Sequence, residues 1–92
     1  METIYKYKLK VEDRQIVKMP INAEILCVQI QHDLPCLWVK LNPEKKETES
    51  RIIETFGTGH PIKTDFRVER KYIGTYQLNK GVYVFHVFES CG

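Results

Sequence analysis

The stretch EILCVQIQHDLPCLWVKL, residues 24–41, decides the fold. Apolar side chains recur at every second position along residues 24–31 and again along residues 35–41, which is the period of a β-strand. The polar residues 31–33 between them are typical of a hairpin turn. Because both strands are apolar on both faces near their middles, we expect them at the centre of the sheet.

The alternation also assigns side chains to faces. In the second strand, Leu37, Val39 and Leu41 share one face and predict the core, which leaves Trp38 on the opposite face. In the first strand, the same reasoning places Leu26, Val28 and Ile30 on one side and Ile25, Cys27 and Gln29 on the other.

The same period continues outward in both directions. Five further strand patterns are TIYKYKLKV at 3–11, QIVKM at 15–19, RIIETF at 51–56, KYIGTYQL at 71–78 and VYVFHVF at 82–88. The last two flank Asn79, Lys80 and Gly81, where Gly81 suits the left-handed position of a hairpin loop. We therefore predict an all-β fold of about seven strands, a small antiparallel barrel or a strongly bent sheet. The alternative is an α+β fold with one short helix in residues 44–53.

Composition restricts the class of protein. Ninety-two residues predict a single domain, 1–92, and a net charge of +2 does not favour nucleic acid as a partner. The row Lys6, Lys8 and Lys10 more often protects an edge strand from pairing than it binds phosphate. The N-terminal segment has no apolar signal core and no run is long enough to span a membrane, so we expect a cytoplasmic protein.

The cysteines and histidines do not form a metal motif. Cys27, Cys36 and Cys91 have no zinc-site spacing, and Cys27 and Cys36 lie in apolar runs typical of reduced thiols. We expect neither a metal nor a cofactor.

The segment FGTGHPI, residues 56–62, is the candidate site. Gly57 and Gly59 can adopt positive φ and turn successive N–H groups toward an anion, while Thr58 adds a hydroxyl and His60 an imidazole. It opens a connection, residues 57–70, that is long for a compact domain without a function. The alternative is a tight bend in which the glycines only relieve strain.

Other residues complete the hypothesis. Arg67 and Arg70 would supply positive charge near the glycines, and Trp38 a surface for stacking a planar ligand. His86 lies on an apolar strand face, where a hydrogen-bonded structural histidine is the commoner case. If His60 and His86 met in one pocket, they would form a general acid/base pair.

The order of motifs resembles a family of small uncharacterised proteins encoded by phages and prophages, a domain of unknown function. FGTGHPI and VFHVFE, residues 56–62 and 84–89, are the most specific pieces of the resemblance. It implies a compact domain of phage provenance, acting in the bacterial host cytoplasm, and it implies no activity.

Two classes of function follow, besides a purely structural or interaction domain. The favoured one is a non-enzymatic binding protein, and more specifically a homo-oligomer active in counter-defence. It would sequester a small anionic, nucleotide-like ligand or block a host protein. The competing one is a small phosphoester hydrolase or lyase that uses His60 and His86.

Overall fold

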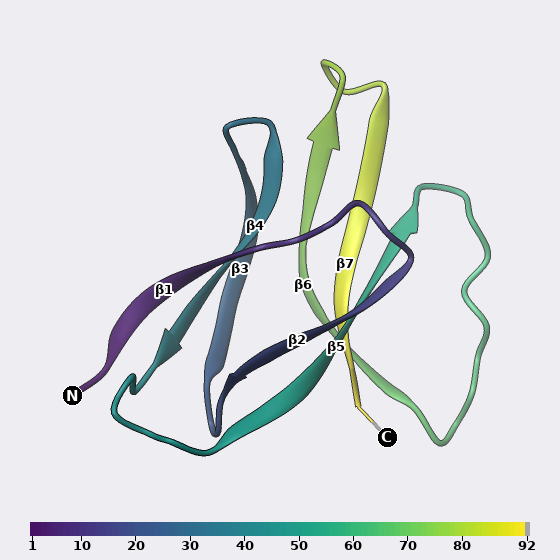
Figure 1. Ribbon diagram of the computed structural model, residues 1–92. Helices are drawn as coiled ribbons and strands as arrows, with labels where there is room; N and C mark the ends of the chain where they lie inside the picture. Colours follow the sequence, from purple (N-terminus) through teal and green to yellow (C-terminus); the bar gives the residue numbers. More distant parts are fainter. Residues whose placement is uncertain (92) are drawn as a thin grey trace.

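The computed structural model describes residues 1–91 and is built of antiparallel strands (Figure 1). A three-stranded sheet has the order β1-β4-β3, and a four-stranded sheet has the order β2-β5-β7-β6. The strands are β1 (Thr3–Lys8), β2 (Arg14–Pro20), β3 (Glu24–Gln31), β4 (Leu34–Leu41), β5 (Thr48–Gly57), β6 (Glu69–Leu78) and β7 (Tyr83–Cys91). The predicted all-β fold is confirmed. The two sheets do not close into a barrel, which is consistent with the predicted strongly bent sheet.

The alternative helix in residues 44–53 is wrong. The Asn42 side chain accepts a hydrogen bond from the Glu44 amide at 3.0 Å, which forms a local turn. From Thr48 onward the chain pairs with β2, with Thr48 opposite Pro20. The β-branched pair Ile52 and Ile53 fits a strand better than a helix. Residues 1–91 contain no helix that could cross a membrane.

The β3–β4 hairpin forms where the sequence predicts it. His32 and Asp33 both have positive φ, at 52° and 65°, as a two-residue hairpin turn requires. The expectation that both strands are central is correct only for β4, since β3 lies at the edge of its sheet. A bulge between Ile25 and Cys27 leaves Leu26 exposed, so the predicted face of Leu26 is wrong.

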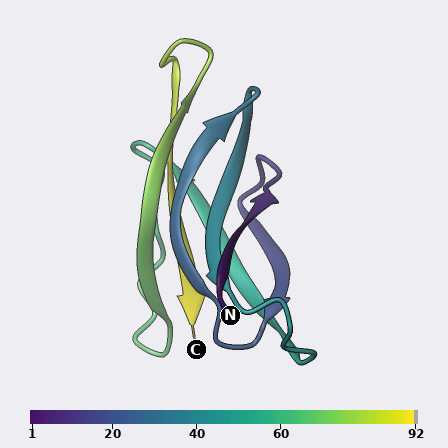
Figure 2. The same cartoon turned by 90° about the vertical axis from the view of Figure 1, so that its left-hand side faces the viewer.

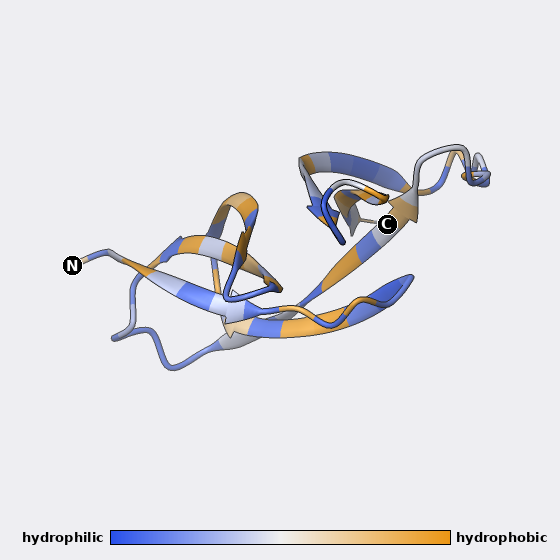
Figure 3. Ribbon diagram, turned by 90° about the horizontal axis from the view of Figure 1, so that it is seen from above, coloured by the Kyte–Doolittle hydropathy of each residue, from blue (hydrophilic) through white to orange (hydrophobic). Residues whose placement is uncertain are grey.

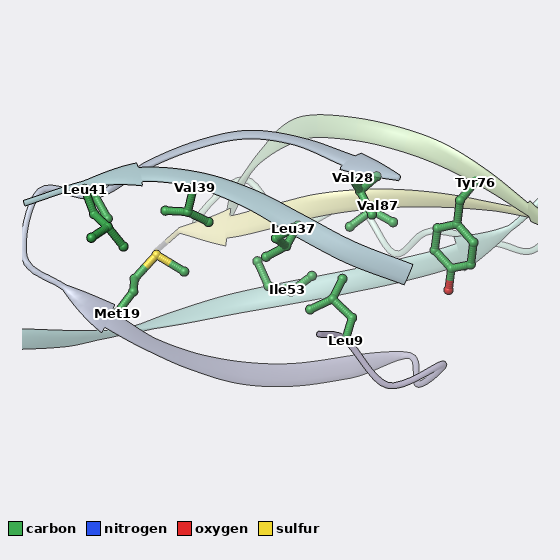
Figure 4. Close-up of a cluster of buried hydrophobic side chains, with 10 residues drawn as sticks. Leu9, Met19, Val28, Leu37, Val39, Leu41, Ile53, Tyr76 and Val87 are labelled. Atoms are coloured by element: carbon green, nitrogen blue, oxygen red, sulfur yellow. The ribbon is translucent and has the colours of Figure 1, made fainter. Parts of the chain in front are cut away.

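The core lies between the two sheets (Figure 4). Leu37, Val39 and Leu41 of β4 are fully buried, as the alternation predicts. From the four-stranded sheet they meet Ile53 and Val87, and apolar and polar positions alternate along the strands (Figure 3). Each strand therefore presents one face to the core and its other face outward.

The edges β3 and β6 meet side by side across the gap between the sheets (Figures 1 and 2). Gly74 of β6 lies so close to β3 that an added Cβ would come within 2.9 Å of Val28 Cγ1. A bulge between Tyr72 and Gly74 accompanies this contact. The absence of a side chain at Gly74 lets the two sheets approach.

The last hairpin and the long connection set the position of the candidate site. Asn79, Lys80 and Gly81 all have positive φ, and the left-handed conformation predicted for Gly81 is confirmed at 87°. Because β5 and β6 flank β7 and both run antiparallel to it, the connection through residues 58–68 returns from one end of β7 to the other (Figure 1). Gly57 is paired with Phe85, so the glycine turn that starts this connection lies beside the first residues of β7.

Candidate functional site

The glycine turn is held by its own backbone. The Thr58 N–H donates to Val84 O at 3.1 Å, and the His60 N–H donates to Gly57 O at 3.0 Å. Gly59 has a φ of 86°, which supplies the left-handed residue of the turn. The prediction that these amides converge on an open anion site is thus wrong for Thr58 and His60. Both N–H groups already donate to backbone carbonyl oxygens of the protein.

His60 lies directly against Gly57. A Cβ added at Gly57 would stand 2.8 Å from both Cε1 and Nδ1 of the imidazole. Gly57 has no positive φ, so the need for glycine here comes from this close approach rather than from backbone conformation. The ring is therefore placed by the turn, although the residue as a whole is exposed.

A hollow opens next to this ring. It has a volume of about 270 Å³ and is lined by Gly57, Thr58, His60, Val82 just before β7, and the first residues of β7, Tyr83, Val84 and Phe85. We call it the glycine-turn pocket. The rings of Tyr83 and Phe85 are nearly parallel, with centroids 6.4 Å apart. The pocket thus combines an imidazole with an aromatic pair, a setting for a planar group.

The sequence pattern does not single out Tyr83 or Phe85 as site residues. They alternate at the start of a strand, which places both on one face, but only the pairing of Gly57 with Phe85 brings that face to the turn. Strand register is the missing information.

A second hollow, of about 350 Å³, adjoins His60 and is lined by Asp13, Arg14, Glu54, Thr55, Phe56, His60 and Pro61. It exists because β2 begins at Arg14, opposite Glu54, so the last residues of β5 have no partner on that side. Within residues 1–91 the exposed Arg14 guanidinium has no hydrogen bond or ion pair. We call this the Arg14 hollow.

The two predicted arginines are engaged elsewhere. Arg67 contacts Asp65 at 3.2 Å, and this hydrogen bond lowers the pKa of the Asp65 carboxyl. Arg70 donates to Glu54 at 2.9 Å and lies over the Phe56 ring, 5.6 Å from its centroid. Neither arginine lines the glycine-turn pocket.

Trp38 lies in the other sheet. It belongs to β4, on the face opposite Leu37 and Val39, and lines neither hollow. The structure therefore brings Gly57, Thr58 and His60 together at one pocket, beside Gly59, and leaves Trp38 apart from them.

His86 belongs to a chain of hydrogen bonds on the outer face of the four-stranded sheet. Its Nε2 lies 2.7 Å from Thr58 Oγ1 and its Nδ1 lies 3.1 Å from Thr75 Oγ1. The Tyr72 hydroxyl lies 2.5 Å from the same Thr75 oxygen. Both ring nitrogens are occupied by neutral hydroxyls, as expected for a histidine with a structural role.

His60 and His86 lie on opposite faces of the sheet. Side chains alternate along β5, so Gly57 shares the core-side face with Phe85, its partner on β7. The His60 ring stands where a Gly57 side chain would be. His86 is the partner of Phe56 and faces outward. The two hollows lined by His60, the glycine-turn pocket and the Arg14 hollow, do not include His86.

The comparison with protein families places the chain. A family described as "Domain of unknown function (DUF7352)" matches residues 1–91. The chain belongs to the DUF7352 family. This confirms the part of the resemblance that placed it in a family of unknown function. No curated protein and no solved structure matches it.

In this DUF7352 domain the pocket presents two hydrogen-bonding side chains beside an aromatic surface. The imidazole of His60 and the hydroxyl of Tyr83 can each donate or accept a hydrogen bond, and Phe85 supplies an apolar surface. Such a pocket can orient a planar ligand by its polar edge while its faces contact aromatic rings.

Proposed function

We propose that the protein is a non-enzymatic binding protein that holds a nucleotide-like ligand in the glycine-turn pocket. The observation that carries the proposal is that His60 and the Tyr83–Phe85 pair line one hollow. In the proposed complex, the planar base lies against the aromatic rings and its polar edge meets His60. Because His60 is positioned by its contact with Gly57, little ordering is needed when the ligand binds.

The anionic part of the ligand would lie toward the Arg14 hollow. His60 lines both hollows, and in the proposed complex one molecule extends past it from one hollow to the other. The guanidinium of Arg14 is free to form charge-assisted hydrogen bonds with a phosphate. In the proposal Arg14 supplies the positive charge that the sequence had assigned to Arg67 and Arg70. Those two arginines are paired with Asp65 and Glu54.

The acid/base alternative has less support. General acid/base catalysis needs both groups within reach of one substrate, and His60 and His86 lie on opposite faces of the sheet. His86 is also already bonded at both ring nitrogens.

The resemblance to phage-encoded proteins supplies the setting of the proposal. There the protein would act in the bacterial cytoplasm by sequestering a nucleotide signal of host defence, or by blocking a host protein. Val82 and Tyr83 at the rim of the pocket are 67% and 55% exposed, and we include in the proposal a homo-oligomer in which a second copy covers them.

Thermal-shift measurements with a panel of nucleoside mono-, di- and triphosphates test the proposal. A ligand present at about 100 times its dissociation constant adds about 2.7 kcal/mol of stability, which raises the melting temperature of a domain of this size by roughly 11 °C or more. The proposal fails if no nucleotide raises it.

Variants then locate the binding. His60→Ala and Tyr83→Ala should abolish the shift, and Arg14→Gln should reduce it for phosphorylated ligands but not for the free nucleoside. His32→Asn is the matched control, because His32 lies at a hairpin tip with positive φ, which asparagine tolerates. A shift that persists in His60→Ala would place the ligand elsewhere.

A further inference from the structure

The outer face of the three-stranded sheet carries the only tryptophan of the chain among lysines. Trp38 is directly opposite Lys6 on β1 and opposite Cys27 on β3. Lys8 follows two positions along β1 and so shares the face of Lys6. We call this set, Lys6, Lys8, Cys27 and Trp38, the tryptophan face.

Trp38 is not part of the core. The side chains of β4 that fill the interior are Leu37, Val39 and Leu41, on the opposite face, whereas Trp38 is half-buried at the surface. A large ring in this place is therefore not explained by packing between the sheets. Part of the ring stays exposed on the outer face of the sheet, where an aromatic surface can contact a planar ligand.

The charges on this face are separated. At one end, Lys40 forms ion pairs with two glutamates, Glu24 at 3.7 Å and Glu2 at 4.0 Å. At the other end, Lys6 contacts only the neutral side chain of Gln31, at 2.6 Å, and Lys8 has no side-chain partner within residues 1–91. Trp38 thus lies next to uncompensated positive charge, although the net charge of the whole chain is only +2.

We propose that the tryptophan face binds single-stranded nucleic acid. Proteins that bind single strands without sequence preference combine aromatic side chains, on which bases stack, with cations along the backbone path. Here a base would stack on Trp38 and the adjoining phosphates would contact Lys6 and Lys8. An acidic peptide would satisfy the lysines but would have no planar group for Trp38. A duplex would keep its bases stacked inside.

Because Trp38 is the only tryptophan, its emission reports binding at this face directly. The full-length protein is titrated with oligothymidylate at low salt, and tryptophan fluorescence is recorded beside the anisotropy of a labelled strand. We expect quenching that follows the same isotherm as the anisotropy. Binding without quenching would put the strand elsewhere and overturn the proposal, as would the absence of binding.

Variants separate stacking from charge. Trp38→Ala should weaken binding about tenfold, while Trp38→Phe should retain most of the affinity. Lys6→Gln and Lys8→Gln should each lower the slope of log affinity against log salt by about 0.7. Lys18→Gln is the control, because Lys18 lies on β2 of the other sheet and is exposed. Thermal melts confirm that each variant is folded.

Two further outcomes would overturn the proposal. If Lys18→Gln changes the slope as much as Lys6→Gln does, attraction is diffuse and the face is not a site. If poly-glutamate quenches Trp38 with the same affinity as oligothymidylate, the partner is an acidic chain and stacking plays no part. Because His60→Ala should leave this binding unchanged, failure here is independent of the glycine-turn pocket.

Discussion

The ion pair between Arg51 and Glu89 gives the sharpest prediction about stability. Arg51 on β5 holds Glu89 on β7 with two hydrogen bonds, Nη2 to Oε1 at 2.9 Å and Nε to Oε2, and its Nη1 donates to Ala23 O at 2.8 Å. Ala23 directly precedes β3. The guanidinium therefore ties the four-stranded sheet to the start of the edge strand of the other sheet.

The burial of this pair sets the size of the effect. The Arg51 and Glu89 side chains are only 16% and 10% exposed, and the hydrogen bond to Glu89 raises the pKa of Arg51 despite its burial. Removing one partner of a buried pair costs about 3–5 kcal/mol. Glu49, 3.8 Å from Arg51, still offers partial compensation, so Glu89→Ala should lie at the lower end, about 3 kcal/mol.

The assay is urea unfolding followed by circular dichroism, supported by thermal melts. A loss of about 3 kcal/mol in a domain of this size corresponds to a fall of at least about 12 °C in melting temperature. The double variant Arg51→Met, Glu89→Leu should recover most of the stability that Glu89→Ala loses, because it leaves neither charge of the pair buried without its partner. A cost below about 1 kcal/mol for Glu89→Ala, the value of an exposed pair, would refute the reasoning.

Three further predictions concern single side chains. Gly74→Ala should cost about 1–3 kcal/mol in urea unfolding, because its Cβ would meet the buried, β-branched Val28 at 2.9 Å; a neutral result would contradict the close contact. Gly57→Ala should displace only the movable His60 ring, so calorimetry should show weaker nucleotide binding with nearly unchanged melting; full affinity would argue against the placed imidazole. Tyr76→Phe should raise stability by up to about 1 kcal/mol, since the buried hydroxyl has no partner within residues 1–91. Burial also raises the pKa of Tyr76 above 10.0, so stability should fall as the pH rises past this value, and melts between pH 8 and 11 should show a smaller fall in Tyr76→Phe.

Strand alternation was sufficient to predict most of the fold. The buried set Leu37, Val39 and Leu41 and the left-handed Gly81 follow from local rules alone. The bulge that exposes Leu26 does not, because it depends on how β3 registers with β4. The edge position of β3 was also out of reach, since it reflects a division into two sheets that depends on contacts between distant segments.

The sequence indicated only the part of the candidate site that is formed by neighbouring residues of the chain. The turn residues Gly57, Thr58 and His60 line one hollow, and they are neighbours in the sequence. The other wall comes from β7, and the charge of Arg70 is taken by Glu54, 16 residues earlier in the chain. Such long-range pairings cannot be recognised from local sequence patterns. Neither the place of Phe85 in the pocket nor the ion pair between Arg70 and Glu54 could therefore be predicted.

Chemical-shift mapping is the most direct test of the glycine-turn pocket. Uniformly ¹⁵N-labelled protein is titrated with the nucleotide that gives the largest thermal shift, and the backbone amides and the His60 ring are followed. We predict that the largest changes fall on Gly57, Thr58, His60, Tyr83 and Phe85, with smaller ones at Arg14. Perturbations confined to other surfaces, with the His60 ring unaffected, would contradict the proposed function.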